Sequence, residues 1–299
     1  MHRSIPTVLA LATAVACAGP TPRYDVLEAE LRDVVAEAAP NEVGVALLDL
    51  ATNAYVGIGD TVTMHAASTM KVPVLLELFR QAEAGRFDLD DSVVVRNEFT
   101  SIADGSTYSL SVGDDSDDVL YGVIGGKATY RELARLMIVR SSNLATNILI
   151  EIVDPDSVAA LMDRIGAEGM QVLRGVEDIP AFRRGMNNRT TARALARVLE
   201  VLERCEVTTR ASCDAMIEIL KDQEFNDKIP AGLPPGTPVA HKTGWITGID
   251  HDGAIVYPPD REPYVLVVLT RGFEDDRAQA KEVAAEISRL VWQGLTGGR

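Results

Sequence analysis

Strand-like segments lie at the two ends of this 299-residue sequence, and helical segments fill the part between them. Runs of apolar residues bounded by turn residues indicate strands at 42–50, 54–59, 237–243, 251–257 and 264–271. Apolar residues recur at helical spacing in 24–38, 68–84, 129–140, 143–152, 157–165, 190–203, 212–221 and 277–292. The polar, glycine-rich stretch 100–127 is expected to be a long loop with short helical pieces.

This order predicts an α/β fold of the α+β type. We expect one antiparallel five-stranded sheet, flanked by the N- and C-terminal helices, with an all-helical lobe inserted between its strands. No internal repeat or linker divides the chain, so residues 24–299 are expected to form a single domain.

The first residues have the composition of an export signal. Arg3 supplies a short basic region, and residues 5–16 form an apolar run that is too short to span a bilayer, which takes about 20 residues. Small residues then lead into Cys17, so residues 1–16 are predicted to be a lipoprotein-type signal peptide. Cleavage without lipidation at the neighbouring alanines is the alternative. The protein is therefore expected to be exported, either free in the periplasm or anchored to a membrane through a lipid on Cys17.

An excess of acidic residues excludes one class of partner. The sequence has 44 acidic and 29 basic residues, for a net charge of −15, whereas nucleic-acid phosphates require clustered Lys and Arg. We therefore expect no nucleic-acid partner. The densest acidic run, at 114–118, is expected to be a solvated loop. Calcium binding is the alternative, but the twelve-residue EF-hand pattern is missing.

The cysteines and histidines indicate no metal or cofactor. Cys205 and Cys213 lie between two helical segments, where a local disulfide is expected in an oxidising compartment and two free thiols are the alternative. His65 and His251 belong to no His-x-x-x-His or Gly-x-Ser-x-Gly pattern. Neither a metal site nor a Ser-His-Asp triad is expected, and nothing suggests an organic cofactor.

A serine and a lysine stand at the start of the predicted helix 68–84. Ser68 and Lys71 are three residues apart and therefore share one face of a helix. Serine needs an adjacent base to act as a nucleophile, and a desolvated lysine with a lowered pKa can serve. Taken alone, the pair can equally be a capping serine beside a surface lysine.

Two further motifs follow it. Ser141-Ser142-Asn143 begins a predicted helix, where an N-cap is the alternative explanation, and His241-Lys242-Thr243-Gly244 ends a predicted strand, where a glycine turn is the alternative. Ser-x-x-Lys, then Ser-x-Asn about seventy residues on and Lys-Thr-Gly about a hundred further, resembles the motif set of class A β-lactamases and penicillin-binding serine hydrolases. The resemblance covers nearly all of 24–299 and implies a DD-peptidase/β-lactamase-like fold. Ser142 is a departure, because class A members usually carry Asp there.

The resemblance implies a catalytic role for three of these residues. Ser68 attacks a carbonyl carbon and forms an acyl-enzyme. Lys71 is the candidate base for that attack. The Ser141 hydroxyl passes a proton to the leaving nitrogen.

The resemblance also implies how a substrate binds. Asn143 holds the substrate amide, while Lys242 and Thr243 bind the substrate carboxylate. The backbone N–H of Trp245, which follows Gly244, forms the oxyanion hole together with the backbone N–H of the nucleophile.

The machinery for releasing the acyl group departs from the class A pattern. Class A enzymes place a Glu between the second and third motifs, with an Asn a few residues later, to activate water. Here Glu177 is the best candidate and Asp178 the next, but the usual spacing is not reproduced, and the nearest asparagines are Asn187 and Asn188. A solvated loop carboxylate is the alternative for Glu177.

That residue separates the candidate functions. With a working base, the expected function is a class A-like serine β-lactamase that hydrolyses the β-lactam amide and confers antibiotic resistance. Without one, the alternatives are a D-Ala-D-Ala carboxypeptidase or esterase, or a penicillin-binding sensor that does not hydrolyse its ligand. The expected partner is a small-molecule β-lactam or a peptidoglycan peptide. Nothing in the sequence suggests an obligate protein partner, so we expect a monomer.

Overall fold

The computed structural model describes residues 24–297. It contains a five-stranded antiparallel sheet in the order β2-β1-β11-β10-β9. The strands are β1 (Glu42–Asp49), β2 (Tyr55–Ile58), β9 (Val239–Ile246), β10 (Ile249–Val256) and β11 (Tyr264–Arg271). The predicted α+β architecture is confirmed. The export signal predicted at 1–16, and Cys17, lie outside the described residues. Across the described range, none of the helices combines the length and apolarity that a bilayer crossing requires.

The middle strand of the sheet, which comes from the C-terminal part of the chain, pairs with a strand from the N-terminal part. Strand β11 pairs with β1 along its whole length, from Glu42 opposite Arg271 to Asp49 opposite Tyr264. Every β11 side chain from Tyr264 to Thr270 is buried. Antiparallel sheets commonly leave one face in water and alternate polar with apolar residues. This run is apolar from Tyr264 to Leu269 because both faces of the sheet are covered.

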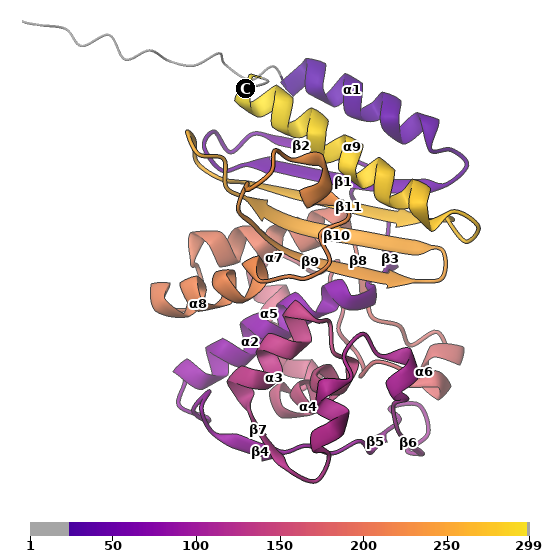
Figure 1. Cartoon of the computed structure of the whole chain (residues 1–299), viewed down its shortest axis with the longest axis vertical. Helices are drawn as coiled ribbons and strands as arrows, with labels where there is room; N and C mark the ends of the chain where they lie inside the picture. The colour runs from indigo at the N-terminus through magenta and orange to yellow at the C-terminus, as the bar shows by residue number, and fades with distance from the viewer. Residues whose placement is uncertain (1–23, 298–299) are drawn as a thin grey trace, which may run out of the picture.

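Two layers of helices provide that cover (Figure 1). Helices α1 (Tyr24–Glu37) and α9 (Arg277–Thr296) pack on one face, and the helical lobe packs on the other. Val45 of β1 belongs to the core under α1 and α9, whereas its neighbour Ala46 belongs to the core under the lobe. Successive strand residues point to opposite faces, so one strand supplies both cores.

The lobe helices begin and end at sequence signals. Thr129 and Glu132 form a capping box at the start of α3, and Gly166 ends α5 in a left-handed conformation. The helices are α2 (Lys71–Glu83), α3 (Tyr130–Val139), α4 (Asn143–Val153), α5 (Pro155–Ile165), α7 (Ala192–Arg204) and α8 (Arg210–Lys221).

Short elements account for most differences from the sequence-based prediction. The helix predicted at 68–84 opens with a 3-10 turn, η1, and becomes an α-helix only at Lys71. Helix α6 and three small two-stranded sheets were not predicted, because elements of two to five residues carry too little periodicity. These elements are α6 (Ile179–Arg183), β3 (Met64–His65) with β8 (Arg189–Thr190), β4 (Ser92–Val94) with β7 (Lys127–Thr129), and β5 (Phe99–Thr100) with β6 (Thr107–Tyr108). The described residues also contain the 3-10 helices η1 (Ala67–Met70), η2 (Val112–Asp114), η3 (Val119–Val123) and η4 (Ile229–Gly232). Of these, η2 and η3 are short helical pieces of the kind expected within 100–127.

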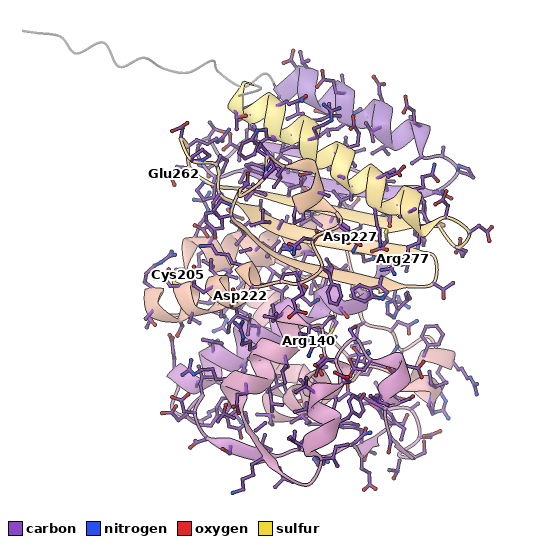
Figure 2. The ribbon with its side chains drawn as sticks, viewed as in Figure 1. Arg140, Cys205, Asp222, Asp227, Glu262 and Arg277 are labelled. Atoms are coloured by element: carbon purple, nitrogen blue, oxygen red, sulfur yellow. A yellow bond between two sulfur atoms is a disulfide. The ribbon has the colours of Figure 1, made fainter. Side chains whose placement is uncertain are left out.

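The acidic run at 114–118 is not a solvated loop throughout, so that prediction is wrong for two of its residues. Asp117 is 1% exposed, and its carboxylate forms an ion pair with Arg140, labelled in Figure 2, whose Nη1 is 2.9 Å away. Asp115 accepts the backbone N–H of Asn143 at 2.9 Å. Both carboxylates therefore bind groups at the second motif.

Cys205 and Cys213 are joined by a disulfide, with their Cα atoms 5.8 Å apart. Cys205, labelled in Figure 2, is the left-handed residue that ends α7, and Cys213 is a buried residue of α8. The bond therefore closes the short connection between these two helices.

Candidate active site

A cavity of about 420 Å³ lies where the sheet meets the helical lobe. Its lining includes Ser68 and Lys71 of the first motif, Asn143 of the second, and Trp245, which follows the third. Glu177 also lines it, although more than thirty residues separate it from any of these in sequence. The fold thus gathers these five predicted site residues around one space.

The turn that carries Ser68 packs directly against strand β9. A Cβ atom on Gly244 would lie 2.7 Å from the Ser68 nitrogen and 2.9 Å from the Thr69 nitrogen, closer than real Cβ atoms approach other atoms. Glycine at this position therefore lets the strand approach the nucleophile. Ala67, directly before Ser68, has φ of 46°, a left-handed conformation that is uncommon for a residue with a side chain.

Lys71 is fully buried at the start of α2. Its Nζ donates to the Ser141 carbonyl oxygen at 2.7 Å, to Ser141 Oγ at 3.2 Å and to Asn143 Oδ1 at 2.9 Å. Burial lowers the pKa of Lys71 from its usual 10.5 to about 7, and the negative charges of Asp115 and Glu177 oppose that lowering. A lysine that loses its proton near neutral pH can act as a general base.

Ser141 connects the two buried lysines. Its backbone is left-handed, with φ of 58°, and its Oγ accepts from Lys71 Nζ at 3.2 Å and from Lys242 Nζ at 3.1 Å. A hydroxyl has two acceptor sites and one hydrogen. Because both acceptor sites are occupied, the hydrogen of Ser141 is the part left to interact with another group.

Lys242 and Thr243 present an amine and a hydroxyl from β9. Lys242 is fully buried, and its pKa is lowered well below the usual value by burial and by the charge of Lys71. Thr243 is also fully buried, and its Oγ1 has no hydrogen-bond partner within the part of the chain that the structure describes. Buried hydroxyls are normally hydrogen-bonded, so the hydrogen-bonding capacity of this atom stays unused among the described residues.

Asn143 connects the lysine to a carboxylate. Its Oδ1 accepts from Lys71, and its Nδ2 donates to Glu177 Oε1 at 3.1 Å. The N-terminus of α4 that holds Asn143 is fixed by Asp115, whose carboxylate accepts the backbone N–H groups of Asn143 at 2.9 Å and Leu144 at 3.0 Å. Class A members usually place an Asp within the second motif; here an acidic side chain from a separate loop reaches the same helix end.

Glu177 is a half-buried carboxylate that faces the site. Burial raises its pKa above the usual value, and the charges of Asp114 and Asp115 raise it further, whereas the hydrogen bond from Asn143 lowers it. The residue has φ of 61°, so strain of the kind often found at functional sites occurs here too. Its place on the cavity wall differs from that of a solvated loop carboxylate.

Neighbouring side chains hold the Glu177 segment in place. Asn147 donates from Nδ2 to the Val176 carbonyl oxygen at 3.0 Å and accepts the Val176 N–H at 2.6 Å. Asp178 is 1% exposed and accepts from Ser101 Oγ at 2.7 Å and from the Ile102 N–H at 3.0 Å. Asp178, the second candidate base from the sequence, is therefore occupied in holding the backbone.

Of the two asparagines that follow in the sequence, Asn188 binds backbone groups and Asn187 binds a side chain. Asn188 Oδ1 accepts the N–H groups of Leu173 and Arg174, and its Nδ2 donates to the Arg174 carbonyl oxygen. Asn187 Oδ1 accepts from Arg174 Nη2 at 3.2 Å. These contacts fix the segment before Glu177.

Trp245 forms one edge of the cavity. Its ring is met edge-on by Phe225 at a centroid distance of 4.9 Å, and Lys228 Nζ and Arg277 Cζ lie 5.6 and 5.1 Å from its centroid. Lys228 is 1% exposed and forms an ion pair with Asp250, with Nζ 2.9 Å from Oδ1. The indole is therefore held between an aromatic ring and two cations.

Sequence reasoning missed Asp115 and Asn147 as site residues. Asn147 lies four residues after Asn143 and so on the same helix face, and this spacing was a usable signal. Asp115 lies 28 positions before Asn143, and no local pattern connects the two. Long-range pairs of this kind are set by the fold.

The fold and the site together define the superfamily of β-lactamases and penicillin-binding serine hydrolases. Residues 26–295 match the family described as the β-lactamase enzyme family, and the chain belongs to it. It is 26% identical over 258 residues to a β-lactamase of Bacillus licheniformis, an alignment that spans 85% of this chain and 79% of that protein.

Two solved structures are similar over nearly the whole chain. The β-lactamase from Sphaerobacter thermophilus has a TM-score of 0.77 and 25% identity, with 92% of this chain and 98% of that one covered. A mutant of PBP-A, solved as an acyl-enzyme complex with penicillin G, has the same TM-score, identity and coverage.

Proposed function

We propose that the protein is a class A-like serine β-lactamase that hydrolyses the β-lactam amide through an acyl-enzyme on Ser68. The observation that carries this proposal is the chain of contacts from Lys71 through Asn143 to Glu177. It connects a candidate base for acylation to a second, half-buried carboxylate that faces the same cavity. A protein that only had to be acylated would not need that carboxylate.

In acylation, the Ser68 oxygen attacks the β-lactam carbonyl carbon while its proton passes to the neutral amine of Lys71. The tetrahedral oxyanion is stabilised by the backbone N–H groups of Ser68 and Trp245. The C–N bond then breaks, and the ring nitrogen takes a proton from Ser141 Oγ. That proton is replaced from a neighbouring lysine, Lys71 or Lys242, whose Nζ atoms lie 3.2 and 3.1 Å from the same oxygen.

Binding of the substrate carboxylate falls to Lys242 and Thr243. The unpartnered Thr243 Oγ1 gains a hydrogen bond when an anionic oxygen reaches it. The nearby cations Lys228 and Arg277 are both paired with Asp250, which leaves the substrate carboxylate to Lys242 and Thr243.

In deacylation, Glu177 accepts a proton from a water molecule, whose oxygen attacks the ester carbonyl. The Ser68–acyl bond breaks, and Ser68 recovers its proton from the active-site acids. Because the pKa of Glu177 is raised, its carboxylate accepts a proton more readily than an exposed one.

Intact-protein mass spectrometry with a penicillin tests this proposal. Wild-type protein is expected to open the drug with a transient adduct or none, and Ser68→Ala to show neither adduct nor turnover. Glu177→Gln is expected to form the adduct at a near-normal rate and then retain it, with deacylation slowed at least about 10²-fold. Asp178→Asn controls for a carboxylate in the same segment. Rapid turnover by Glu177→Gln would contradict the role given to Glu177.

A long-lived acyl-enzyme is the second candidate, favoured by the similarity to PBP-A, a mutant of which was solved as an acyl-enzyme complex with penicillin G. In that case the protein is a D-Ala-D-Ala carboxypeptidase, an esterase or a non-hydrolysing penicillin sensor. A wild-type adduct on Ser68 that persists would support this candidate. Assays with D-Ala-D-Ala peptides and with esters would then separate the peptidase and esterase from the sensor.

We further propose that the protein is exported, with residues 1–16 removed and Cys17 lipidated. Radiolabelled palmitate is expected to label the protein in cells, and Cys17→Ser to remain unlabelled and be released from membranes. Export without labelling of either form would indicate ordinary cleavage. A monomer is proposed for the purified protein, and a mass of about one chain by light scattering is the expected result.

A further inference from the structure

His65 lies three residues before the nucleophile, and its ring contacts the backbone of that turn. His65 Nδ1 accepts the backbone N–H of Ala67 at 3.0 Å. Ala67 is the left-handed residue, with φ of 46°, directly before Ser68. The angle φ describes rotation about the N–Cα bond of Ala67. The hydrogen bond therefore fixes the amide at one end of this strained bond.

A second histidine, which lies in the sheet, binds the backbone of the first. His251 of β10 is fully buried, and its Nε2 lies 2.9 Å from the His65 carbonyl oxygen. Its Nδ1 accepts the backbone N–H of Thr270, in β11, at 3.1 Å. The strand residue Thr270 is thus connected through two imidazole rings to Ala67.

The partners of the two rings determine where their protons lie. Backbone N–H groups only donate and carbonyl oxygens only accept, so His251 carries its proton on Nε2 and His65 accepts at Nδ1. His65 therefore has to be neutral to accept the Ala67 N–H, and His251 has to be neutral to accept the Thr270 N–H. Burial and the charges of Arg174 and Arg189 lower the pKa of His65 to about 4, and burial lowers that of His251 to about 4.

The Ser68 amide has little space on its other side. Strand β9 approaches it so closely at Gly244 that a Cβ there would lie 2.7 Å from the Ser68 nitrogen. The position of this N–H, proposed above as an oxyanion-hole donor, therefore depends on β9 on one side and on the Ala67 conformation on the other.

We propose that His65 is a positioning residue for acylation: by accepting the Ala67 N–H it holds the strained turn and aims the Ser68 N–H at the developing oxyanion, while His251 anchors His65 to the sheet. The kinetic part rests on the proposed acyl-enzyme mechanism. The structural part, the Nδ1 acceptor and the restrained Ala67 amide, does not.

Two amide substitutions separate this role from a general structural one. In His65→Asn the side-chain oxygen is the same number of bonds from Cα as Nδ1 of the histidine. It can therefore accept the Ala67 N–H. In His65→Gln the amide lies one bond further out, near the position of Nε2. The variants are similar in polarity and differ in which ring nitrogen they replace.

Stopped-flow acylation by a chromogenic cephalosporin gives the kinetic readout, with the acylation rate constant separated from the dissociation constant of the initial complex. We expect His65→Asn to stay within about threefold of wild type and His65→Gln to lose about tenfold or more in the rate constant, with a smaller change in the dissociation constant. Equal rates for wild type and His65→Gln, or equal losses in both variants, would overturn the proposal.

Nuclear magnetic resonance tests the structural part without any substrate. Two-bond ¹H–¹⁵N correlations are expected to show the Nε2–H tautomer for both His65 and His251, and the Ala67 amide is expected to exchange slowly in wild type and His65→Asn but faster in His65→Gln. An Nδ1–H tautomer at His65, or an unprotected Ala67 amide in wild type, would overturn the proposal. If no β-lactam acylates wild type, the proposed function fails, while these spectra still decide the role of His65.

Discussion

Backbone strain in this protein is concentrated at individual site residues. Six non-glycine residues in the described range have positive φ, and Ala67, Ser141 and Glu177 are three of them. Each such conformation costs on the order of 1–3 kcal/mol and persists only where surrounding contacts enforce it. Those contacts are His65 for the first, Lys71 for the second and Asn147 with Asp178 for the third. Several side chains thus hold the backbone of the site in place, and they keep the site rigid.

The lowered pKa of Lys71 predicts how acylation depends on pH. Only the neutral amine can accept the Ser68 proton, so the acylation rate is expected to rise as the pH passes upward through about 7. Lys71→Arg keeps the positive charge but does not lose its proton in this range, and is expected to acylate about 10²–10⁴ times more slowly. Stopped-flow acylation between about pH 5.5 and about pH 8.5 measures both effects. A flat wild-type profile would be inconsistent with Lys71 as the base.

At the residue scale, the candidate catalytic groups were easier to predict from the sequence than the groups that hold them in place. Ser68, Lys71, Ser141 and Lys242 stand in short motifs, and the structure brings them together. The role of Asp115 depends on a contact made 28 positions away in sequence. Such a contact follows from the path of a loop, which periodicity does not determine.

At the scale of elements, the N-terminus of α4 has both a structural and an electrostatic role. The first N–H groups of a helix have no partner within the helix and favour a negative charge. Ser142 accepts one of them, from Ala145 at 3.3 Å, and Asp115 accepts those of Asn143 and Leu144. The helix end that presents Asn143 is therefore held by a charge that also acts on Lys71.

Removing that charge is expected to shift the pH profile. The negative charge of Asp115 raises the pKa of Lys71, so Asp115→Asn is expected to move the rising limb of acylation to lower pH. It is also expected to lower the free energy of unfolding by about 1 kcal/mol through the weakened cap. Asp118→Asn, an exposed position in the same run, removes an identical charge as the control. Equal shifts in both variants would show a general charge effect.

The close approach of β9 to η1 predicts a severe effect of one added methyl group. In Gly244→Ala the new Cβ meets backbone nitrogens that cannot move without displacing Ser68, so we expect a loss of about 10²-fold in acylation rate. In Gly253→Ala, on the neighbouring strand, the Cβ meets the end of the Leu195 side chain at 2.8 Å. That control is expected to lower the melting temperature while the folded protein still acylates. Normal acylation by Gly244→Ala would contradict the tight packing.

Long elements were predictable and short ones were not. The sheet strands and the main helices have enough residues for their apolar period to show, and their observed bounds differ from the predicted ones by a few residues. The two-residue strands β3 and β8 carry no such period. They form because the segments on either side bring Met64 opposite Thr190 and His65 opposite Arg189.

At the scale of the whole molecule, the disulfide stabilises a part that takes no part in the cavity. Neither Cys205 nor Cys213 lines it. A bond that closes a loop of sequence separation 8 contributes about 2.5 kcal/mol by restricting the unfolded chain. The double variant Cys205→Ala with Cys213→Ala is expected to lose about that much in denaturant unfolding and to keep its acylation rate. A large loss of acylation in the folded variant would mean that the α7–α8 connection affects the site.

The pairing of β1 with β11 has a consequence for how the chain is made. Glu42 and Arg271 bond to each other although they are 229 positions apart in sequence. At synthesis rates of about 5–20 residues per second, β1 waits at least about 11 s for its partner strand. During that interval the nascent chain has no complete sheet on which to collapse. A secretion pore that admits only unfolded polypeptide would therefore receive this chain in a state it can pass, and folding would be completed on the far side, once the last strand has crossed.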